Sequence, residues 1–406
     1  MAQSPSSSSR VLSNSALSLI WFGAAVSLAE ILSGTFFAPL GLAQGIAAIV
    51  IGHLIGCALF WLISFMSAQT GRTVMEAAKL TFGFRGSVAF SVANVIQLVG
   101  WTAVMIASGA AAAALLVPVL GNAAWSVIIG ALIILWILIG TKRMAIVQSI
   151  ASVALLALTF VVSAAVFGSS TGTAPSDVEP IGFGAAVELA CAMPLSWLPV
   201  AGDYLRKAKH PVAGTTFATA AYGLGSCWMF IIGLGLALFA ASDDLTTVLA
   251  SAGLGLVGII VIVFSTVTTT FLDAESAGIS FTAVFPHCSS KICGIIAGVL
   301  GVVLALVAPV ANFQDFLYLI GSIFAPMAAL MCVDWFVFHH DASHQGFDWP
   351  NIVLWIAGFV LYRCSMSWDF ILGNTFPVMI IVAVASVLVR RGIAYARRRG
   401  SARAEH

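Results

Sequence analysis

The chain contains twelve apolar stretches, and most are long enough to cross a lipid bilayer. A membrane-spanning helix needs about 20 largely apolar residues. Asp, Glu, Lys and Arg make up only 8% of this chain, whereas a soluble domain carries about 25%. Because backbone groups in lipid must bond within their own segment, we predict helices rather than an open sheet. They cover residues 16–38, 43–67, 87–117, 123–140, 144–167, 181–203, 213–240, 250–275, 292–310, 313–335, 350–363 and 370–391.

The basic residues predict an orientation, because Lys and Arg favour the cytoplasmic side of a membrane. With these helices laid end to end, only Arg363 falls outside. We therefore expect a multi-pass protein of the cell (inner or plasma) membrane with both termini in the cytoplasm. The net charge of +1 argues against nucleic acid as a partner. The residues on the inside are Arg10, Arg72, Lys79, Arg85, Lys142, Arg143, Arg206, Lys207, Lys209, Lys291, Arg390, Arg391, Arg397, Arg398, Arg399 and Arg403.

The loops are too short to form a soluble domain, so the chain divides by its helices. We predict a disordered cytoplasmic N-terminus over 1–15, a ten-helix core over 16–335, two additional helices over 350–391 and a basic cytoplasmic tail over 392–406. The seven Cys residues are scattered without a CxxC pair, which gives no metal-site pattern. We expect a monomer without a bound cofactor.

Two predicted helices carry polar or helix-breaking residues at mid-membrane depth. The first contains Ser27, Glu30 and Gly34, and the sixth contains Pro194 and Pro199. These helices begin two five-helix halves of opposite orientation. Paired interruptions in inverted halves are typical of a transporter with its site at the bilayer midplane. The alternative is that the prolines only kink an ordinary helix.

Ionisable residues in these helices are candidates for function, because a charge at the membrane centre costs roughly 2.5–3.5 kcal/mol on insertion scales. Glu30 lies in the expected break, and Glu188 lies about two turns before the second one. The alternative for Glu30 is a protonated acid bonded to a backbone carbonyl. Asp273 and Glu275 lie lower on the eighth helix, and we interpret them as inner-gate or structural acids rather than ligands.

Aromatic and hydroxyl side chains suggest what the site binds. Gln97 and Trp101 are four residues apart and share a helix face. A Gln amide matches the edge of an aminopyrimidine, and Trp101 with Trp197 would stack on a flat ring, although a membrane Trp often only fills a gap between helices. On the eighth helix, the hydroxyls of Ser265, Thr268, Thr269 and Thr270 either bond their own helix or help to bind sodium.

Several of these motifs together resemble the nucleobase–cation symporter family, and cytosine permeases in particular. They are Ala68–Gly71, Phe82–Ser87, Gly100–Trp101, Asp203–Arg206 and Thr268–Thr269, with Asn312–Phe313, Pro326 and Asp334 around the tenth helix. The opening stretch Phe22–Gly34, with Ala38–Gly41, Gly52–Gly56 and Gln97–Met105, is more similar to the branch associated with hydroxymethylpyrimidine and thiamine biosynthesis.

The resemblance implies an all-α leucine-transporter-like fold, a 5+5 inverted repeat with two further helices. It implies import of a pyrimidine or related heterocycle, commonly with sodium. Carried over by position, the sodium ligands are carbonyls of Gly23, Ser27 and Ser265 and hydroxyls of Thr268 and Thr269. Trp101 matches the stacking Trp of the third helix.

The chain departs from the family pattern inside the expected pocket. The substrate-binding Gln of cytosine permeases aligns with Leu98, one position after Gln97, and the aromatic of the sixth helix aligns with Pro194. A family Asn is Thr270 here, and a family Ser is Glu30. A carboxylate accepts from an amine or a hydroxymethyl group, so Glu30 suits a hydroxymethyl-aminopyrimidine. The predicted substrate residues are Glu30, Gln97, Trp101, Ser196, Trp197 and Thr270.

We therefore predict a secondary active importer of a pyrimidine, with hydroxymethylpyrimidine first, coupled to sodium. A permease for cytosine or another nucleobase remains an alternative, as does proton coupling through Glu30 or Glu188. An enzyme is not expected, because His339, His340 and His344 share one loop without a partnering intramembrane motif. A channel fits less well, since paired broken helices suit a closed midplane site.

Overall fold

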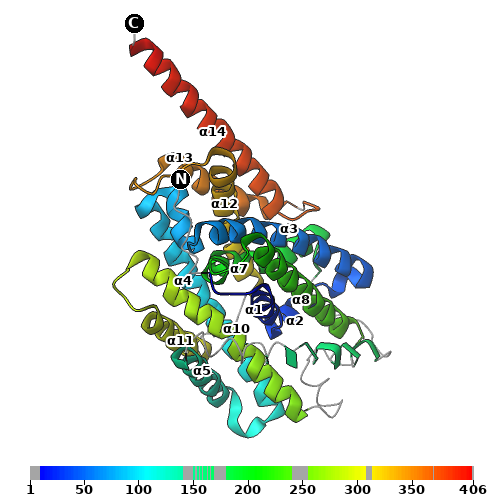
Figure 1. The fold of residues 1–406 in the computed structure, drawn as a ribbon. Coiled ribbons are helices and arrows are strands. Elements are labelled where there is room, and N and C mark those ends of the chain that lie inside the picture. The colour runs from blue at the N-terminus through cyan, green and yellow to red at the C-terminus, as the bar shows by residue number, and fades with distance from the viewer. Residues whose placement is uncertain are drawn as a thin grey trace.

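A computed structural model describes residues 10–139, parts of 150–168, 180–239, 255–307 and 313–404 without 369. Helices bundle around a buried centre, and the end of α14 projects beyond the bundle (Figure 1). Within these residues, eight helices are long and apolar enough to cross a membrane, and α1 with α2 makes a ninth span. The predicted number of twelve thus stays a prediction. Half of the fifth predicted helix, 144–167, lies outside the described residues.

The helices follow the predicted order with shifted ends. They are α1 (Asn14–Ala25), α2 (Leu28–Thr35), α3 (Gly41–Thr70), α4 (Val74–Leu116), α5 (Gly121–Ile139), α7 (Phe183–Leu205), α8 (Pro211–Phe239), α10 (Gly255–Val284), α11 (Ser290–Val307), α12 (Phe313–Cys332), α13 (Trp349–Ser365) and α14 (Thr375–Ala404), with 3-10 turns at Ala38–Leu40 and Pro118–Leu120 and a π-helix at Val333–Phe338.

The first membrane span is broken where the sequence predicts it. Helix α1 ends at Ala25, Ser27 has an extended backbone, and α2 leaves at a bend of 51°. The Ser27 hydroxyl accepts a hydrogen bond from the Glu30 amide at 3.3 Å and so caps α2. The last carbonyls of α1 are thereby released from the helical ladder.

The interruption predicted for the sixth segment is wrong. Helix α7 runs continuously from Phe183 to Leu205 with Pro194 and Pro199 inside it. Each proline removes one backbone hydrogen bond, but neighbouring helices and hydroxyl side chains satisfy freed groups within a membrane. The two prolines free the carbonyls of Ala190 and Leu195, four residues earlier, but α7 is almost entirely buried against its neighbours. The span stays helical through both prolines.

The packing of the two halves is reciprocal. Helix α3, second in the first half, packs along α7, and α8, second in the other half, packs along α1 and α2. A Cβ added to Gly34 of α2 would collide with the Phe230 carbonyl, and one added to Gly233 of α8 with the Ile31 carbonyl. Small residues allow such close crossings. Helices α4 and α10 also pack against each other.

Helix α4 begins earlier than the predicted residue 87 because it is two helices joined at Gly83. Gly83 has a positive φ of 80°, a conformation that suits glycine. The loop before α13 fills the break: Phe84 and Arg85 donate backbone hydrogen bonds to the carbonyls of Gln345 and Gly346, at 2.9 and 2.8 Å. The loop thus bonds the released amides of the second part of α4.

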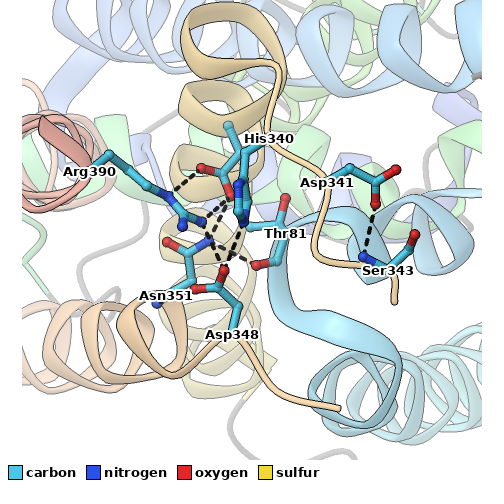
Figure 2. A network of polar contacts seen from close by, with 8 residues as sticks. Thr81, His340, Asp341, Ser343, Asp348, Asn351 and Arg390 are labelled. Atoms are coloured by element: carbon cyan, nitrogen blue, oxygen red, sulfur yellow. Dashed lines mark hydrogen bonds and ion pairs between the residues drawn. The ribbon is translucent and has the colours of Figure 1, made fainter. Parts of the chain in front are cut away.

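Beside this loop, a charged cluster fastens the last two helices to the rest of the bundle (Figure 2). Arg390 of α14 donates to Asp334 at 3.0 and 2.9 Å and to Asp348 at 3.1 Å. Asn351 of α13 donates to Asp334 at 2.7 Å and to the Thr81 carbonyl of α4 at 2.8 Å. The elements around the cluster are therefore tied together by charge-assisted bonds.

Asp348, in the loop, has a lowered pKa. Burial on its own would raise the pKa of this carboxyl, but the hydrogen bond from His340 and the charge of Arg390 outweigh burial. The His340 ring lies 2.9 Å from the carboxylate. Asp348 also accepts from the Asn351 amide and so caps α13.

Candidate functional site

A small cavity lies where the break in the first span faces α4, α7 and α10. Four of the predicted substrate residues line it: Glu30, Trp101, Ser196 and Trp197. The space open to the centre of a water-sized sphere is about 10 Å³, which is room for about one water molecule. The cavity must therefore widen before a ring can enter. The lining residues are Ala24, Ser27, Ala29, Glu30, Trp101, Met105, Met193, Ser196, Trp197, Thr269 and Asp273.

The two indole rings in the wall are held by other aromatic rings. Trp101 of α4 meets Phe316 of α12 edge to face, with ring centroids 5.5 Å apart. Trp197 of α7 meets Trp21 of α1 at 5.8 Å and 90°. Edge-to-face pairs of this kind contribute about 0.5–1.5 kcal/mol beyond burial. The flat apolar surfaces that a heterocycle would stack on are thus held in place.

Glu30 is buried and bonded to α8. Its carboxylate accepts from the Tyr222 hydroxyl at 3.1 Å and from the Ser226 hydroxyl at 2.6 Å. Ser226 in turn lies 2.6 Å from His53 Nε2 of α3, and His53 Nδ1 lies 2.8 Å from the Ile49 carbonyl. The alternative of an acid bonded only to a backbone carbonyl does not describe Glu30, because its partners are side-chain hydroxyls.

The two hydrogen bonds that link Glu30 to His53 through Ser226 need one proton more than the Ser226 hydroxyl supplies. His53 Nδ1 must carry hydrogen, because a carbonyl only accepts. If the His53 ring is neutral, Nε2 accepts a hydrogen bond from the Ser226 hydroxyl. Glu30 must then be protonated, because it has to donate a hydrogen bond to the Ser226 oxygen. If Ser226 donates to Glu30 instead, His53 Nε2 carries the proton. Either way the pair Glu30 and His53 holds a single shared proton.

Two of the predicted sodium residues of α10, Ser265 and Thr269, contact the end of α1. The Ser265 hydroxyl of α10 donates to the Val26 carbonyl at 2.6 Å, and the Thr269 hydroxyl to the Gly23 carbonyl at 3.3 Å. Thr268 bonds its own helix, at the Phe264 and Ser265 carbonyls. These oxygens are the donor type that hard cations prefer. Val26 was not predicted, because a sequence does not place a helix break to a single residue.

Gln97 and Thr270 are buried but do not line the cavity. The Gln97 amide donates to Asn94 at 2.7 Å and to the Ser196 carbonyl at 3.1 Å. It therefore supports α7 behind the cavity wall. The Thr270 hydroxyl has no hydrogen-bond partner among the residues that the structure describes. Their role in binding stays a prediction.

Asp273 lines the cavity, although the sequence analysis predicted it lower on its helix. We expected an inner-gate or structural acid, yet its side chain lines the cavity and is only 3% exposed. Glu275, two residues later, points to a different neighbour and accepts from the Tyr204 hydroxyl at 2.7 Å. A helical repeat of 3.6 residues sends the two carboxylates to different faces.

Glu188 lies away from the cavity, among the last two helices. It accepts from the Tyr362 hydroxyl of α13 and from the amide and hydroxyl of Thr375, both at 2.7 Å. Thr375 is the first residue of α14, where an anionic partner is favourable. The geometry gives Glu188 a structural role, joining α7 to α13 and α14.

The whole chain can be compared with known families. Residues 5–389 match the family described as permease for cytosine/purines, uracil, thiamine, allantoin. The chain belongs to this family. It is 26% identical to the cytosine permease of Escherichia coli K12 over 320 residues, covering 76% of this chain and 74% of that protein. It is 24% identical to the putative purine-cytosine permease YxlA of Bacillus subtilis 168 over 346 residues, covering 79% and 75%.

Solved structures give the same fold. The closed conformation of Mhp1, a nucleobase-cation-symport-1 family transporter with bound bromovinylhydantoin, superimposes with a TM-score of 0.81 at 17% identity, covering 97% of this chain and 96% of the other. A Na⁺-coupled sialic acid symporter gives a TM-score of 0.70 at 15% identity, covering 93% and 88%. These matches confirm the predicted leucine-transporter-like fold.

The family and the fold together confirm the general function. The protein is a multi-pass membrane transporter, a cytosine permease-like nucleobase–cation symporter rather than an enzyme. It carries a nucleobase-like substrate by secondary transport. The cavity at the break of the first span is its candidate substrate site.

Proposed function

We propose that the protein imports a pyrimidine, with hydroxymethylpyrimidine first among the candidates, by sodium-coupled alternating access. The observation that carries this proposal is the placement of Glu30 beside two indole rings in a buried cavity. A flat ring stacks on the indoles, and the carboxylate accepts from an amine or a hydroxymethyl group. We propose that the protein lies in the cell membrane, with both chain termini in the cytoplasm.

Sodium is proposed to bind at the end of α1, between the carbonyls of Gly23, Val26 and Ser27 and the side chains of Ser265 and Thr269. The two hydroxyl bonds that now join α10 to α1 support this choice, because a cation at that point would replace the hydroxyl protons as partner of the carbonyls. One sodium ion crossing 100 mV releases about 2.3 kcal/mol. That free energy sustains roughly fortyfold accumulation.

Purified protein in liposomes is expected to accumulate labelled hydroxymethylpyrimidine when sodium is higher outside. Thr269→Ala is expected to raise the sodium concentration needed for half-maximal uptake about tenfold or more, because a hard cation loses one oxygen ligand. Thr282→Ala is the matched control, since the Thr282 hydroxyl donates to the Ile279 carbonyl of its own helix. If uptake is independent of the sodium concentration in the wild type and in both variants, sodium is not the coupling ion.

Proton coupling is the second candidate, and the shared proton of Glu30 and His53 favours it. In the same liposomes, a pH gradient without sodium would then drive uptake, and His53→Gln would remove the response. Accumulation with sodium at equal pH, combined with no response to the pH gradient, excludes this candidate. The two gradients are therefore measured separately on one preparation.

A further inference from the structure

Asp273 is a buried carboxylate in the cavity wall that the binding scheme above does not use. Its side chain is 97% buried and lines the same small space as Glu30, Trp101 and Trp197. Among the residues that the structure describes, no hydrogen bond or ion pair reaches it, and no Lys or Arg lines the cavity. A buried polar group left without a partner is costly, so a ligand that supplies donors here is bound favourably.

The surroundings of the two carboxylates differ. Both oxygens of Glu30 already accept from hydroxyls of α8, whereas Asp273 keeps both of its oxygens for a ligand. A carboxyl group with two available oxygens pairs with a ring nitrogen and an adjacent exocyclic amine through two parallel hydrogen bonds. Two hydrogen bonds form whether the proton shared by the ring nitrogen and the carboxyl group is bound to the nitrogen or to the carboxyl oxygen.

We propose that Asp273 is a substrate-binding residue that selects heterocycles with an amidine edge, meaning a ring nitrogen next to an amino-bearing carbon. The inference rests on the proposed function and narrows its substrate class to aminopyrimidines and related amino-heterocycles. Asp273 takes the amidine edge that the sequence suggested for Gln97. Glu30 then accepts a hydrogen bond from a second donor elsewhere on the heterocycle. The indoles of Trp101 and Trp197 stack on the faces of the heterocycle.

The test compares two ligands that differ only at this edge, 4-aminopyrimidine and 4-methylpyrimidine, by calorimetry on the full-length protein in lipid nanodiscs. The wild-type protein is expected to bind the amino compound at least tenfold more tightly, since a hydrogen bond to a buried charged group contributes that much or more. Asp273→Leu is expected to reduce this preference to under threefold while binding of the methyl compound stays within threefold.

Two further variants separate recognition from a structural effect. Asp273→Asn offers an amide donor and acceptor to the same edge, so it is expected to keep most of the preference for 4-aminopyrimidine over 4-methylpyrimidine. This variant also tests the role of Asp273 if the Leu variant does not fold. Glu275→Gln alters the neighbouring carboxylate, which is bonded to Tyr204 outside the cavity wall, and is expected to leave the preference unchanged.

The outcomes are distinct. If wild-type protein binds hydroxymethylpyrimidine or cytosine but does not distinguish the amino from the methyl compound, the role of Asp273 is overturned and the proposed function stands. An equal preference in wild-type protein and Asp273→Leu overturns it as well. If no pyrimidine binds to wild-type protein with or without sodium, the proposed function itself fails, and with it the inference.

Discussion

Replacing Glu30 with glutamine is expected to reduce uptake of hydroxymethylpyrimidine by about tenfold to a hundredfold, or to change which pyrimidine is carried. Glutamine keeps the size of the side chain, but it cannot ionise and it has one acceptor oxygen instead of two. The hydroxyls of Tyr222 and Ser226 now donate to that carboxylate, and a hydrogen bond to a charged group contributes about 1.5–3 kcal/mol. Initial uptake rates in liposomes, with cytosine and uracil as competitors, measure the effect.

Glu76→Gln is the control for this substitution. Glu76 lies at the start of α4, where it forms a capping box with Thr73, and glutamine also serves in that motif. Uptake by this variant is expected to match the wild type. If Glu30→Gln also leaves both uptake and selectivity unchanged, Glu30 is not part of the substrate site.

Replacing Arg390 with methionine is expected to lower the free energy of unfolding by about 3–5 kcal/mol, the usual cost of removing one partner from a buried ion pair. The substitution leaves Asp334 and Asp348 without their cation, and their side chains are only 1% and 4% exposed. Helix α14 would lose its hydrogen bonds to Asp334 and to Asp348, the residue that caps α13. Thermal unfolding of the purified protein in detergent measures this loss.

Arg391→Met is the control, because the neighbouring Arg391 side chain is exposed and surface substitutions usually change stability by less than about 0.5 kcal/mol. Equal melting temperatures for the two variants would show that the cluster contributes little. A loss that is restored when Asp334 and Asp348 are also made apolar would assign the cost to the unpaired carboxylates.

The sequence predicted the order of helices and the break of the first span for physical reasons. Long apolar runs admit few alternatives in lipid, and Ser27 followed by Glu30 forms a helix start that interrupts the run. The two prolines of α7 gave a misleading signal. A proline shows which hydrogen bond is lost, but the groups that compensate come from other parts of the chain.

The wall of the cavity was only partly predictable. Glu30, Trp101, Ser196 and Trp197 were expected there and line it. Asp273 was placed too low on its helix, because its depth depends on how α10 packs against the broken span, and that packing is a tertiary property. Gln97 shares a helix face with Trp101 but lies behind α7, bonded to the Ser196 carbonyl.

Binding of a heterocycle and binding of a cation at the break in the first span are expected to strengthen each other. Calorimetric titration of hydroxymethylpyrimidine into wild-type protein, at several sodium concentrations, measures this coupling. Sodium is expected to tighten pyrimidine binding, and pyrimidine is expected to tighten sodium binding by the same factor. A pyrimidine affinity that does not change with sodium, or no binding at all, would show that the two ligands are not bound together at this break.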